Sequence, residues 1–483
     1  MPGALAPYPH WLVPGDNTWQ LVAATLVGMM SIPGLAVLYG GLVPRKWSVN
    51  TMVMAFAGFA IVLLVWVLWA FKMSFGTPLG GHGFLGNLVG HPGTVISAAG
   101  EQGQATIPLI SGIGGMPAFH FPMSTLAYFQ FVFAAITPLL FLGSVLGRIK
   151  FKAWIMLVPL WTTFVYAINA FLLWGGGWFA QQGALDYSGG YVIHLSAGVS
   201  GFVAAAMVGP RLRRDRQQGV PTNLMLIAVG AGILWLGWNG FNGGDPYFAG
   251  ADAAAAILNT NLATAAALLT WVVMDMKVSR QRKPTLLGGV NGMICGLVAI
   301  TPSAGWVSGG GAILIGIIAS AIVWLAWTLL PRVRPFSKVD DALGVVYTHG
   351  IAGLAGGLLL GVFGDPAMVE YLGTGGTASF SVRGLLYSGS AHQLLEQLLA
   401  ALWVIGFSAL GTAVVCYVVK VAARGLRMSD EELEVGDLAV HHEEVMPVAS
   451  FAQRGPAAVP AAPGSPPPGR PRPLVRSQAL EET

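Results

Sequence analysis

The stretch His194–Gly201 reads HLSAGVSG and the stretch His349–Gly356 reads HGIAGLAG, so both follow the pattern H-x-x-A-G-x-x-G inside long apolar segments. An ionisable side chain in a membrane helix is rare unless it faces a partner or a transport path. Two histidines in matching surroundings therefore predict one polar route through a membrane, built by an internal repeat. For either histidine alone, a neutral ring bonded to a neighbouring helix carbonyl is an equally good interpretation.

Composition also indicates a membrane protein. Of the 483 residues, 54% are hydrophobic and 10% are charged, against roughly 25% charged in average soluble domains. The 66 glycines favour close helix packing in lipid. The net charge of +4 comes from short basic clusters between apolar runs, which argues against a nucleic-acid partner. The two cysteines, Cys295 and Cys416, lie in apolar runs without zinc-ligand neighbours, so neither a disulfide framework nor a metal site is expected.

Apolar runs of about 17 to 25 residues are long enough for transmembrane helices. Eleven such runs cover residues 18–43, 51–74, 122–146, 152–173, 189–209, 222–241, 254–276, 284–303, 308–331, 343–363 and 394–423. The predicted fold is therefore an all-α membrane protein with eleven transmembrane helices in a lipid bilayer.

Basic residues fall in alternate loops of this arrangement. They lie at 45–46, 148–152, 211–216, 277–283 and 332–338, and at the end of the last helix, whereas the opposite loops hold only Arg383, with Lys72 at a helix end. By the positive-inside rule, the amino terminus lies outside and the carboxyl terminus in the cytoplasm. The first fifteen residues lack a basic region followed by an apolar stretch, so no cleaved signal is expected.

An odd number of helices suits two halves of five helices plus one further helix. The first predicted helix ends in LYGG, Leu38–Gly41, and the sixth in FNGG, Phe241–Gly244, while the fifth and tenth carry the histidine pattern. The offsets are 203 and 155 residues, and an insertion over residues 75–121 explains the difference. Because five is odd, the halves have opposite orientations, which predicts an inverted repeat with its site near the bilayer midplane.

An acidic residue precedes each histidine helix. Asp186 and Asp341 stand eight residues before His194 and His349, which is about 12 Å along a helix. Approaching from opposite faces of a core about 30 Å thick, the two rings reach similar depths. For the pair we therefore favour pore lining, and we expect Asp186 to cap the outer end of its helix.

Longer strings between about Asp16 and Glu444 point to a family. They are PGLAVLYGGLV, FQFVFAAITP, WGGGW, GALDYSGGYVIHLSAG, GWNGFNGG, NTNLATAAALLTW, KPTLLGGVNGMICGLVAITPSAGWVS and HGIAGLAGG. In this order they resemble the ammonium transporter family, the Amt/Mep branch of the Amt/Mep/Rh superfamily. The resemblance implies an eleven-helix protomer with a five-plus-five pseudo-two-fold repeat, a homotrimer with one pore per protomer, and ammonium or ammonia as substrate, without a cofactor.

The resemblance also implies roles for outer residues. Phe129 and Trp174 match aromatic residues of an external recruitment site, where ring faces attract a cation. Asp186 matches an acidic residue that stabilises the cation through neighbouring groups. Phe133 and Phe241 match two stacked rings of a gate. Simple packing would explain Phe129 on its own, since aromatic residues four apart on a helix pack together.

His194 and His349 match the family's twin histidines, which hydrogen-bond to each other along a narrow apolar lumen. A bare cation at mid-membrane costs several kcal/mol at least, so a dry lumen rejects potassium. Ammonium can lose a proton and cross as neutral ammonia, with the imidazoles donating or accepting hydrogen bonds along the way. Whether the proton follows through the histidines stays open.

Several positions depart from the family pattern. Asp245, in FNGGDP, stands where a recruitment-site serine is usual, and it is either an added attraction for the cation or a solvated loop charge. The other departures are Gly147, Tyr191, Asn239, Gly344 and Val346. We therefore expect gating contacts on the cytoplasmic side to differ from those usual in the family.

Three segments are predicted. Residues 1–424 form the ammonium transporter transmembrane domain. Residues 425–446 resemble the family's cytoplasmic regulatory region, which couples protomers and helps a PII-type signal protein to dock, although the family's Gly-Leu-Asp is altered to Gly436-Asp437-Leu438. Residues 447–483 form a Pro- and Ala-rich tail that we expect to be disordered.

Functions of other classes compete with selective ammonium transport. An enzyme is not expected, because the sequence has no H-E-x-x-H or G-x-S-x-G and neither histidine has a nucleophile or third metal ligand at recognisable spacing. An ammonium sensor would normally carry a fused signalling domain, for which about 37 tail residues are too few. Within transport, an Rh-like gas channel is the closest alternative. The Ala, Gly, Pro and Arg usage suggests a bacterium, so we expect a multi-pass protein of a bacterial plasma or inner membrane.

Overall fold

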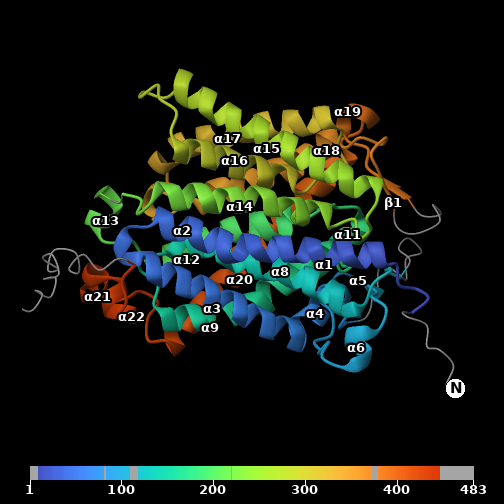
Figure 1. Cartoon of the computed structure of the whole chain (residues 1–483), viewed down its shortest axis with the longest axis horizontal. Coiled ribbons are helices and arrows are strands. Elements are labelled where there is room, and N and C mark those ends of the chain that lie inside the picture. The colour runs from blue at the N-terminus through green and yellow to red at the C-terminus, as the bar shows by residue number, and fades with distance from the viewer. Residues whose placement is uncertain (1–8, 81–82, 109–117, 219, 372–378, 446–483) are drawn as a thin grey trace, which may run out of the picture. The chain divides into compact units, whose positions relative to one another are not determined.

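The computed structural model describes residues 9–80, 83–108, 118–218, 220–371 and 379–445. The chain divides into two units, Met1–Glu443 and Glu444–Thr483. All helices and strands that the structure describes lie in the first unit (Figure 1). The tail predicted over residues 447–483 lies outside the described residues.

Ten helical segments in the described part of the chain are long and apolar enough to cross a membrane. They are Pro14–Leu42, Arg45–Phe75, Met123–Val145, Phe151–Gln182, Gly190–Val208, Leu224–Gly243, Ala251–Lys277, Gly309–Arg332, Val346–Phe363 and His392–Ala422. A further apolar helix, α16 (Leu286–Ile300), has 15 residues. Each of the eleven ranges predicted from hydropathy overlaps one of these helices, and the prediction of a helical membrane protein is confirmed.

The long segments are built from these helices. The first comprises α1 (Pro14–Met29), η1 (Met30–Leu35) and α2 (Ala36–Leu42), and the second η2 (Arg45–Trp47), α3 (Ser48–Val65), η3 (Trp66–Ala70) and α4 (Phe71–Phe75). Next come α8 (Met123–Val145), then α9 (Phe151–Trp161), η4 (Thr162–Tyr166), α10 (Ala167–Leu173) and α11 (Trp178–Gln182), then η5 (Gly190–Leu195) and α12 (Ser196–Val208). The later ones are α14 (Leu224–Gly243), α15 (Ala251–Lys277), α17 (Gly309–Leu329) with η6 (Leu330–Arg332), η8 (Val346–Ile351) with α18 (Ala352–Phe363), and α20 (His392–Ala422).

Short elements lie at the two ends of these helices. α13 (Arg213–Gln218), α21 (Asp430–Val435) and α22 (Asp437–His441) gather at one end, and α5 (Gly83–Gly86), α6 (Ala98–Gln102), α11 and α19 (Leu385–Ser388) at the other (Figure 1). The second end also carries the antiparallel pair of β1 (Val369–Tyr371) and β2 (Ser379–Ser381), in which Glu370 faces Phe380. The 3-10 turn η7 (Phe336–Lys338) lies between η6 and η8.

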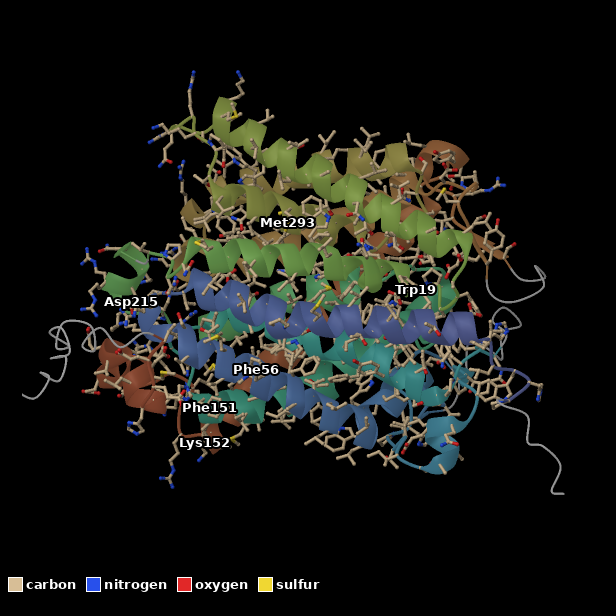
Figure 2. The ribbon with its side chains drawn as sticks, viewed as in Figure 1. Trp19, Phe56, Phe151, Lys152, Asp215 and Met293 are labelled. Atoms are coloured by element: carbon tan, nitrogen blue, oxygen red, sulfur yellow. The ribbon has the colours of Figure 1, made fainter. Side chains whose placement is uncertain are left out.

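Side chains along the helices are mainly apolar, including those that face outward. Figure 2 shows Phe56 and Met293 along the middle of the helices, and Lys152 and Asp215 toward the end that carries α13 and α21. Phe56 is 53% exposed, whereas Met293 is buried. Outward-facing apolar side chains on long helices are expected where lipid replaces water.

Helix α8 occupies the core, because its sequence is apolar on every side. In this helix 94% of the most apolar window is buried. Pro122, in extended conformation, precedes it. This central helix carries both Phe129 and Phe133 on one side, four residues apart.

The repeated histidine pattern is explained by a close helix crossing. Gly198 lies so near the backbone of Gly350 that a Cβ would overlap it, and Gly353 leaves no room for a Cβ beside the Gly190 carbonyl and His194. Both histidine-bearing elements, η5 and η8, are π-helical, a rare geometry that is frequent at functional sites. The small residues of each pattern therefore bring the two histidine helices together.

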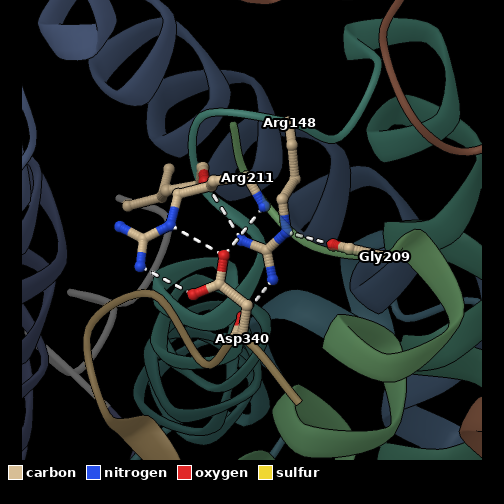
Figure 3. Close-up of polar contacts among 5 residues, drawn as sticks. Arg148, Gly209, Arg211 and Asp340 are labelled. Atoms are coloured by element: carbon tan, nitrogen blue, oxygen red, sulfur yellow. Dashed lines mark hydrogen bonds and ion pairs between the residues drawn. The ribbon is translucent and has the colours of Figure 1, made fainter. Parts of the chain in front are cut away.

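A polar cluster at the α13 and α21 end holds three interhelical loops together. Arg148 is fully buried, and its guanidinium donates hydrogen bonds to the carbonyl oxygens of Gly209 (2.6 Å), Leu146 (3.2 Å) and Asp340. The Arg211 guanidinium pairs with both carboxylate oxygens of Asp340, at 3.0 and 2.7 Å (Figure 3). We call Arg148, Arg211 and Asp340 the inner cluster.

The segment after α20 packs against the start of α3 and the loop before it, at the same end. The Asp437 carboxylate accepts hydrogen bonds from the backbone N–H groups of Val49 (2.7 Å) and Asn50 (2.8 Å), at the start of α3. Lys46 Nζ donates to the Leu433 carbonyl at 2.7 Å. Of the predicted regulatory segment, residues 425–445 are described, and its two short helices are held on the loop between α2 and α3.

Candidate functional site

A column of aromatic rings runs through the core beside α8 and α14. The rings of Phe129 and Phe133 on α8 lie 4.8 Å apart, and Phe133 stacks on Phe241 of α14 at 4.3 Å. Trp174, after α10, meets Phe133 edge-on at 6.2 Å. All three phenylalanines are fully buried. The structure thus brings together four aromatic residues that the sequence singled out.

The column continues to the two histidines. The Phe241 ring lies 5.9 Å from His194, and the Nδ1 atoms of His194 and His349 are 3.2 Å apart, in a hydrogen bond. Since each neutral ring has one donor and one acceptor nitrogen, one histidine donates and the other accepts. The sequence prediction that these rings meet is confirmed. Within the described residues, the buried Nε2 atom of His194 has no hydrogen-bond partner.

Trp238 is a partner of His194 that sequence reasoning missed. Its ring stacks on His194 at 5.2 Å, and its indole N–H donates to Thr301 Oγ1 at 2.9 Å. A signal was present, because Trp238 lies three residues before Phe241 and so on the same face of α14. The His194 ring is consequently held from one side by an indole and from the other by His349.

Asp186 forms the expected helix cap. Its carboxylate accepts backbone hydrogen bonds from Gly189 at 3.1 Å and from Tyr191 and Val192 at 2.9 Å each. Burial raises the pKa of Asp186 to about 6, and these backbone bonds act in the opposite direction. The Trp174 indole N–H donates to the Asp186 carbonyl at 2.6 Å, which fixes the ring beside the cap.

Asp341 has a similar place before the second histidine element. Its Oδ2 accepts a hydrogen bond from the Val346 N–H at 2.8 Å. Burial raises the pKa of Asp341 above its usual range, while the backbone bond lowers it. The two acids therefore cap η5 and η8 in the same way.

Asp245 is buried, so the interpretation as a solvated loop charge is wrong. Its side chain follows α14 and is 6% exposed. The preceding residue, Gly244, packs against the Phe129 ring so closely that a Cβ would overlap it. Tyr247, two residues later, meets Phe129 edge-on at 6.0 Å. The structure therefore places the loop of Asp245 directly beside the aromatic column.

Buried hydroxyl groups near Asp245 were not found by sequence reasoning. They belong to Tyr166, Tyr187 and Ser188, and like Asp245 Oδ2 they have no hydrogen-bond partner of good geometry among the described residues. Ser188 is nevertheless close enough to lower the pKa of Asp245, which burial raises well above its usual range. We call these four residues the outer cluster. Their only sequence signal was that Tyr187 and Ser188 follow Asp186.

Comparison with known proteins identifies the family. The model of the Ammonium Transporter Family matches residues 18–446. The chain belongs to this family. Ammonium transporter 3 member 1 of Oryza sativa subsp. japonica is 46% identical over 454 residues, with 90% of this chain and 88% of that protein covered. Ammonium transporter 2 of Arabidopsis thaliana is 45% identical, with 91% and 90% covered.

Solved structures agree with this assignment. The crystal structure of Saccharomyces cerevisiae Mep2 has a TM-score of 0.74 and 28% identity, covering 87% of this chain and 89% of that one. A structure described as a sensor Amt protein has a TM-score of 0.73 at 24% identity, which shows the fold alone. The family resemblance inferred from sequence is confirmed.

In this ammonium transporter family member, a cavity of about 1110 Å³ lies near the second histidine element. Its lining includes Trp271, Asp275, Trp327, Asp341 and Tyr347. Tyr347 lies in η8, two residues before His349. Among the described residues, no group of three or more His, Cys, Asp or Glu side chains could hold a metal ion.

Proposed function

We propose that this protein is a selective ammonium transporter or channel, and not an enzyme. The observation that carries the proposal is the hydrogen bond between His194 and His349 at the end of the buried aromatic column, in a chain of the ammonium transporter family. A hydrogen-bonded pair of neutral rings offers a polar path without a fixed charge, which suits a small neutral molecule.

Recruitment of ammonium takes place at the outer end of the column. The faces of Phe129 and Trp174 attract the cation, and the charge of Asp245 strengthens this attraction. Asp186 acts indirectly, because its carboxylate is occupied by three backbone N–H groups and its carbonyl oxygen by the Trp174 indole. It positions the ring that holds the ion.

Deprotonation comes before passage through the gate. The stacked rings of Phe133 and Phe241 exclude water and bare cations, since a charge at mid-membrane costs several kcal/mol at least. Ammonia passes when the rings part. It then moves along His194 and His349 toward the cavity that Tyr347 and Asp341 line. The proton or its charge then follows in the same direction.

The proposed topology has eleven membrane helices, with α16 as the eighth. Two halves of five helices form an inverted repeat, supported by the matching caps of Asp186 and Asp341 and by matching glycine contacts. Gly201 packs on Ser144 of α8, and Gly356 packs on Ala299 of α16. The basic loops place α13 and α21 in the cytoplasm and the amino terminus outside.

The sequence resemblance and the composition support a proposal for assembly and location. We propose a homotrimer with one pore per protomer, in a bacterial plasma or inner membrane. Residues 425–446 form the cytoplasmic regulatory segment, to which a PII-type signal protein docks.

The test is a current measurement on a solid-supported membrane with proteoliposomes of the purified protein. Ammonium and potassium pulses are applied to the wild type and to the double variant His194→Ala/His349→Ala. We expect a current with ammonium only, which the double variant loses or replaces by potassium leakage. His392→Ala serves as the matched control, because the His392 side chain is 73% exposed and lies outside the column. Silence of the wild type toward both ions, with ammonium still bound, would contradict electrogenic transport and favour a gas channel or a sensor.

A further inference from the structure

The outer cluster combines four buried polar atoms that lack partners. Asp245 Oδ2 and the hydroxyl oxygens of Tyr166, Tyr187 and Ser188 have no hydrogen-bond partner of good geometry in the described part of the chain. Tyr166 and Ser188 are fully buried, and Tyr187 and Asp245 are each 6% exposed. A buried polar atom without a partner lowers the stability of the fold. Four of them in one place point to a ligand rich in hydrogen-bond donors.

The cluster adjoins the aromatic column from two sides. The loop of Asp245 reaches Phe129 through the contacts of Gly244 and Tyr247. Ser188 lies two residues after Asp186, whose carbonyl oxygen binds the Trp174 indole. An ion held between the rings of Phe129 and Trp174 therefore lies beside the loop that carries Asp245. Ammonium has four N–H donors and matches the acceptors of this cluster.

Building on the proposed function, we propose that Asp245 accepts the proton that the recruited ammonium loses before ammonia passes Phe133. In this step an N–H bond of ammonium breaks, its electron pair stays on nitrogen, and the proton bonds to Asp245 Oδ2. The carboxyl group then releases this proton, which follows the ammonia in the proposed transport, and Asp245 becomes a carboxylate again. A serine hydroxyl at this position could not take the proton in this way.

Asp245 suits this role better than the neighbouring Asp186. The Asp186 carboxylate already accepts three backbone hydrogen bonds, whereas Oδ2 of Asp245 accepts none of good geometry. Burial raises the pKa of Asp245 well above its usual range, and Asp186 and Glu370 raise it further while Ser188 lowers it. A raised pKa reduces the free-energy cost of moving a proton from ammonium to the carboxylate.

Other titratable groups that couple to Asp245 come from three elements packed around it. They are Tyr166 at the end of η4, Tyr187 before η5 and Tyr247 on the same loop, and burial raises the pKa of the tyrosines outside the spans, Tyr187 and Tyr247. The carboxyl groups of Asp186 and Glu370 also raise the pKa of Asp245. Burial raises the pKa of Asp186 itself to about 6, so a fall in transport at low external pH involves more than one carboxyl group. The part of this fall that disappears in the Asp245 variants reports Asp245.

The experiment measures ammonium uptake into proteoliposomes against external pH for wild type, Asp245→Asn, Asp245→Glu and Asp245→Ser. The wild-type rate should fall as the pH is lowered through the pKa of Asp245, because only the carboxylate accepts a proton. The Asn and Ser variants should lose at least about tenfold in maximal rate, and their rate should fall less at low pH. The Glu variant should recover the rate and its pH dependence in part. The rise in melting temperature that ammonium causes, compared with the same concentration of potassium, is measured for each variant. It tests binding and folding separately from transport.

The outcomes separate this inference from the proposed function. If the wild type carries no ammonium, the proposed function fails first. The inference is wrong if the wild type carries ammonium and the Asn variant keeps its maximal rate. It is also wrong if the Asn variant is slower but its rate falls at low pH as fully as that of the wild type. In either case Asp245 is at most an attracting charge. The Ser variant, which has the residue usual in the family, decides the matter if the Asn variant does not fold.

Discussion

The inner and outer clusters differ in how many of their polar groups have hydrogen-bond partners. In the inner cluster, Arg148 donates to three carbonyl oxygens and Arg211 pairs with both oxygens of Asp340. In the outer cluster, Asp245 Oδ2 and three hydroxyl groups lack such partners. Desolvation is costly in both places, but only the inner cluster compensates for it within the protein. A complete set of partners indicates a role in the fold, and an incomplete one indicates a place for a ligand.

The largest effect is expected for Arg148→Met, which keeps much of the side-chain volume and removes every donor. Three carbonyl oxygens, in one buried and two partly buried hydrogen bonds, then lose their partner, so we expect a loss of roughly 3 kcal/mol or more in unfolding free energy. Thermal unfolding in detergent measures it. Arg216→Met is the matched control, because Arg216 is exposed. Equal stability of the two variants would contradict a structural role for the inner cluster.

A smaller effect is expected for Asp437→Asn in the segment after α20. Asp437 is 1% exposed and accepts two backbone hydrogen bonds at the start of α3. Replacing one acceptor oxygen by an amide places two donors together, at a cost of about 1.5–3 kcal/mol. Hydrogen exchange of residues 430–441 should become faster, whereas Asp430→Asn, with a side chain 71% exposed, should leave it unchanged. Unchanged protection in Asp437→Asn would mean that other contacts hold this segment.

The comparison is sharpest between two acids of the outer mouth. Asp186→Asn should reduce the unfolding free energy by about 1–2 kcal/mol, because three N–H groups lose a charged acceptor. Asp245→Asn should change it by less than about 0.5 kcal/mol or raise it, since the free Oδ2 has no partner to lose. Melting curves without ammonium measure both. A strong destabilisation by Asp245→Asn would show that this carboxylate serves the fold.

The last prediction concerns the pH dependence of stability and Glu370, a buried acid on β1. Trp306 donates to it at 2.9 Å, and burial raises the pKa of Glu370 from 4.5 to about 8. The folded state therefore holds a proton that the unfolded state has released, so stability falls as pH rises from about 4.5 to about 8. Glu370→Gln should lack this part of the decline, and its advantage over wild type should grow across that window. Glu431→Gln, at an exposed site, should follow the wild type, and a parallel decline in Glu370→Gln would contradict the assignment.

Local sequence patterns were sufficient for the helices and the central pair. The apolar runs overlap the long apolar helices, and the repeated H-x-x-A-G-x-x-G pattern predicted that His194 and His349 meet. The acid eight residues before His194 predicted the helix cap that Asp186 forms. Asp341, at the same distance before His349, also binds a backbone N–H group of its helix. These features depend on residues close together in the chain or on a repeat that is visible in the sequence.

Contacts between distant segments had no such signal. Arg148 meets Asp340 across 192 positions, and Asp437 meets Val49 across 388. The burial of Asp245 was equally hidden, because FNGGDP is typical of an exposed turn and only the packing of Gly244 on Phe129 brings it inside. Loop packing of this kind depends on the whole helix arrangement, so the outer cluster could not be predicted.

In the proposed transport, the stacked rings of Phe133 and Phe241 also limit the speed of crossing. Their centroids lie 4.3 Å apart, at an angle of 24° between the planes, so no molecule passes while they are in contact. Each crossing must wait for a thermal excursion of two packed rings, which is slower than the motion of exposed side chains. Turnover is then governed by the frequency of ring opening, and cooling should slow this protein more steeply than an open, water-filled channel.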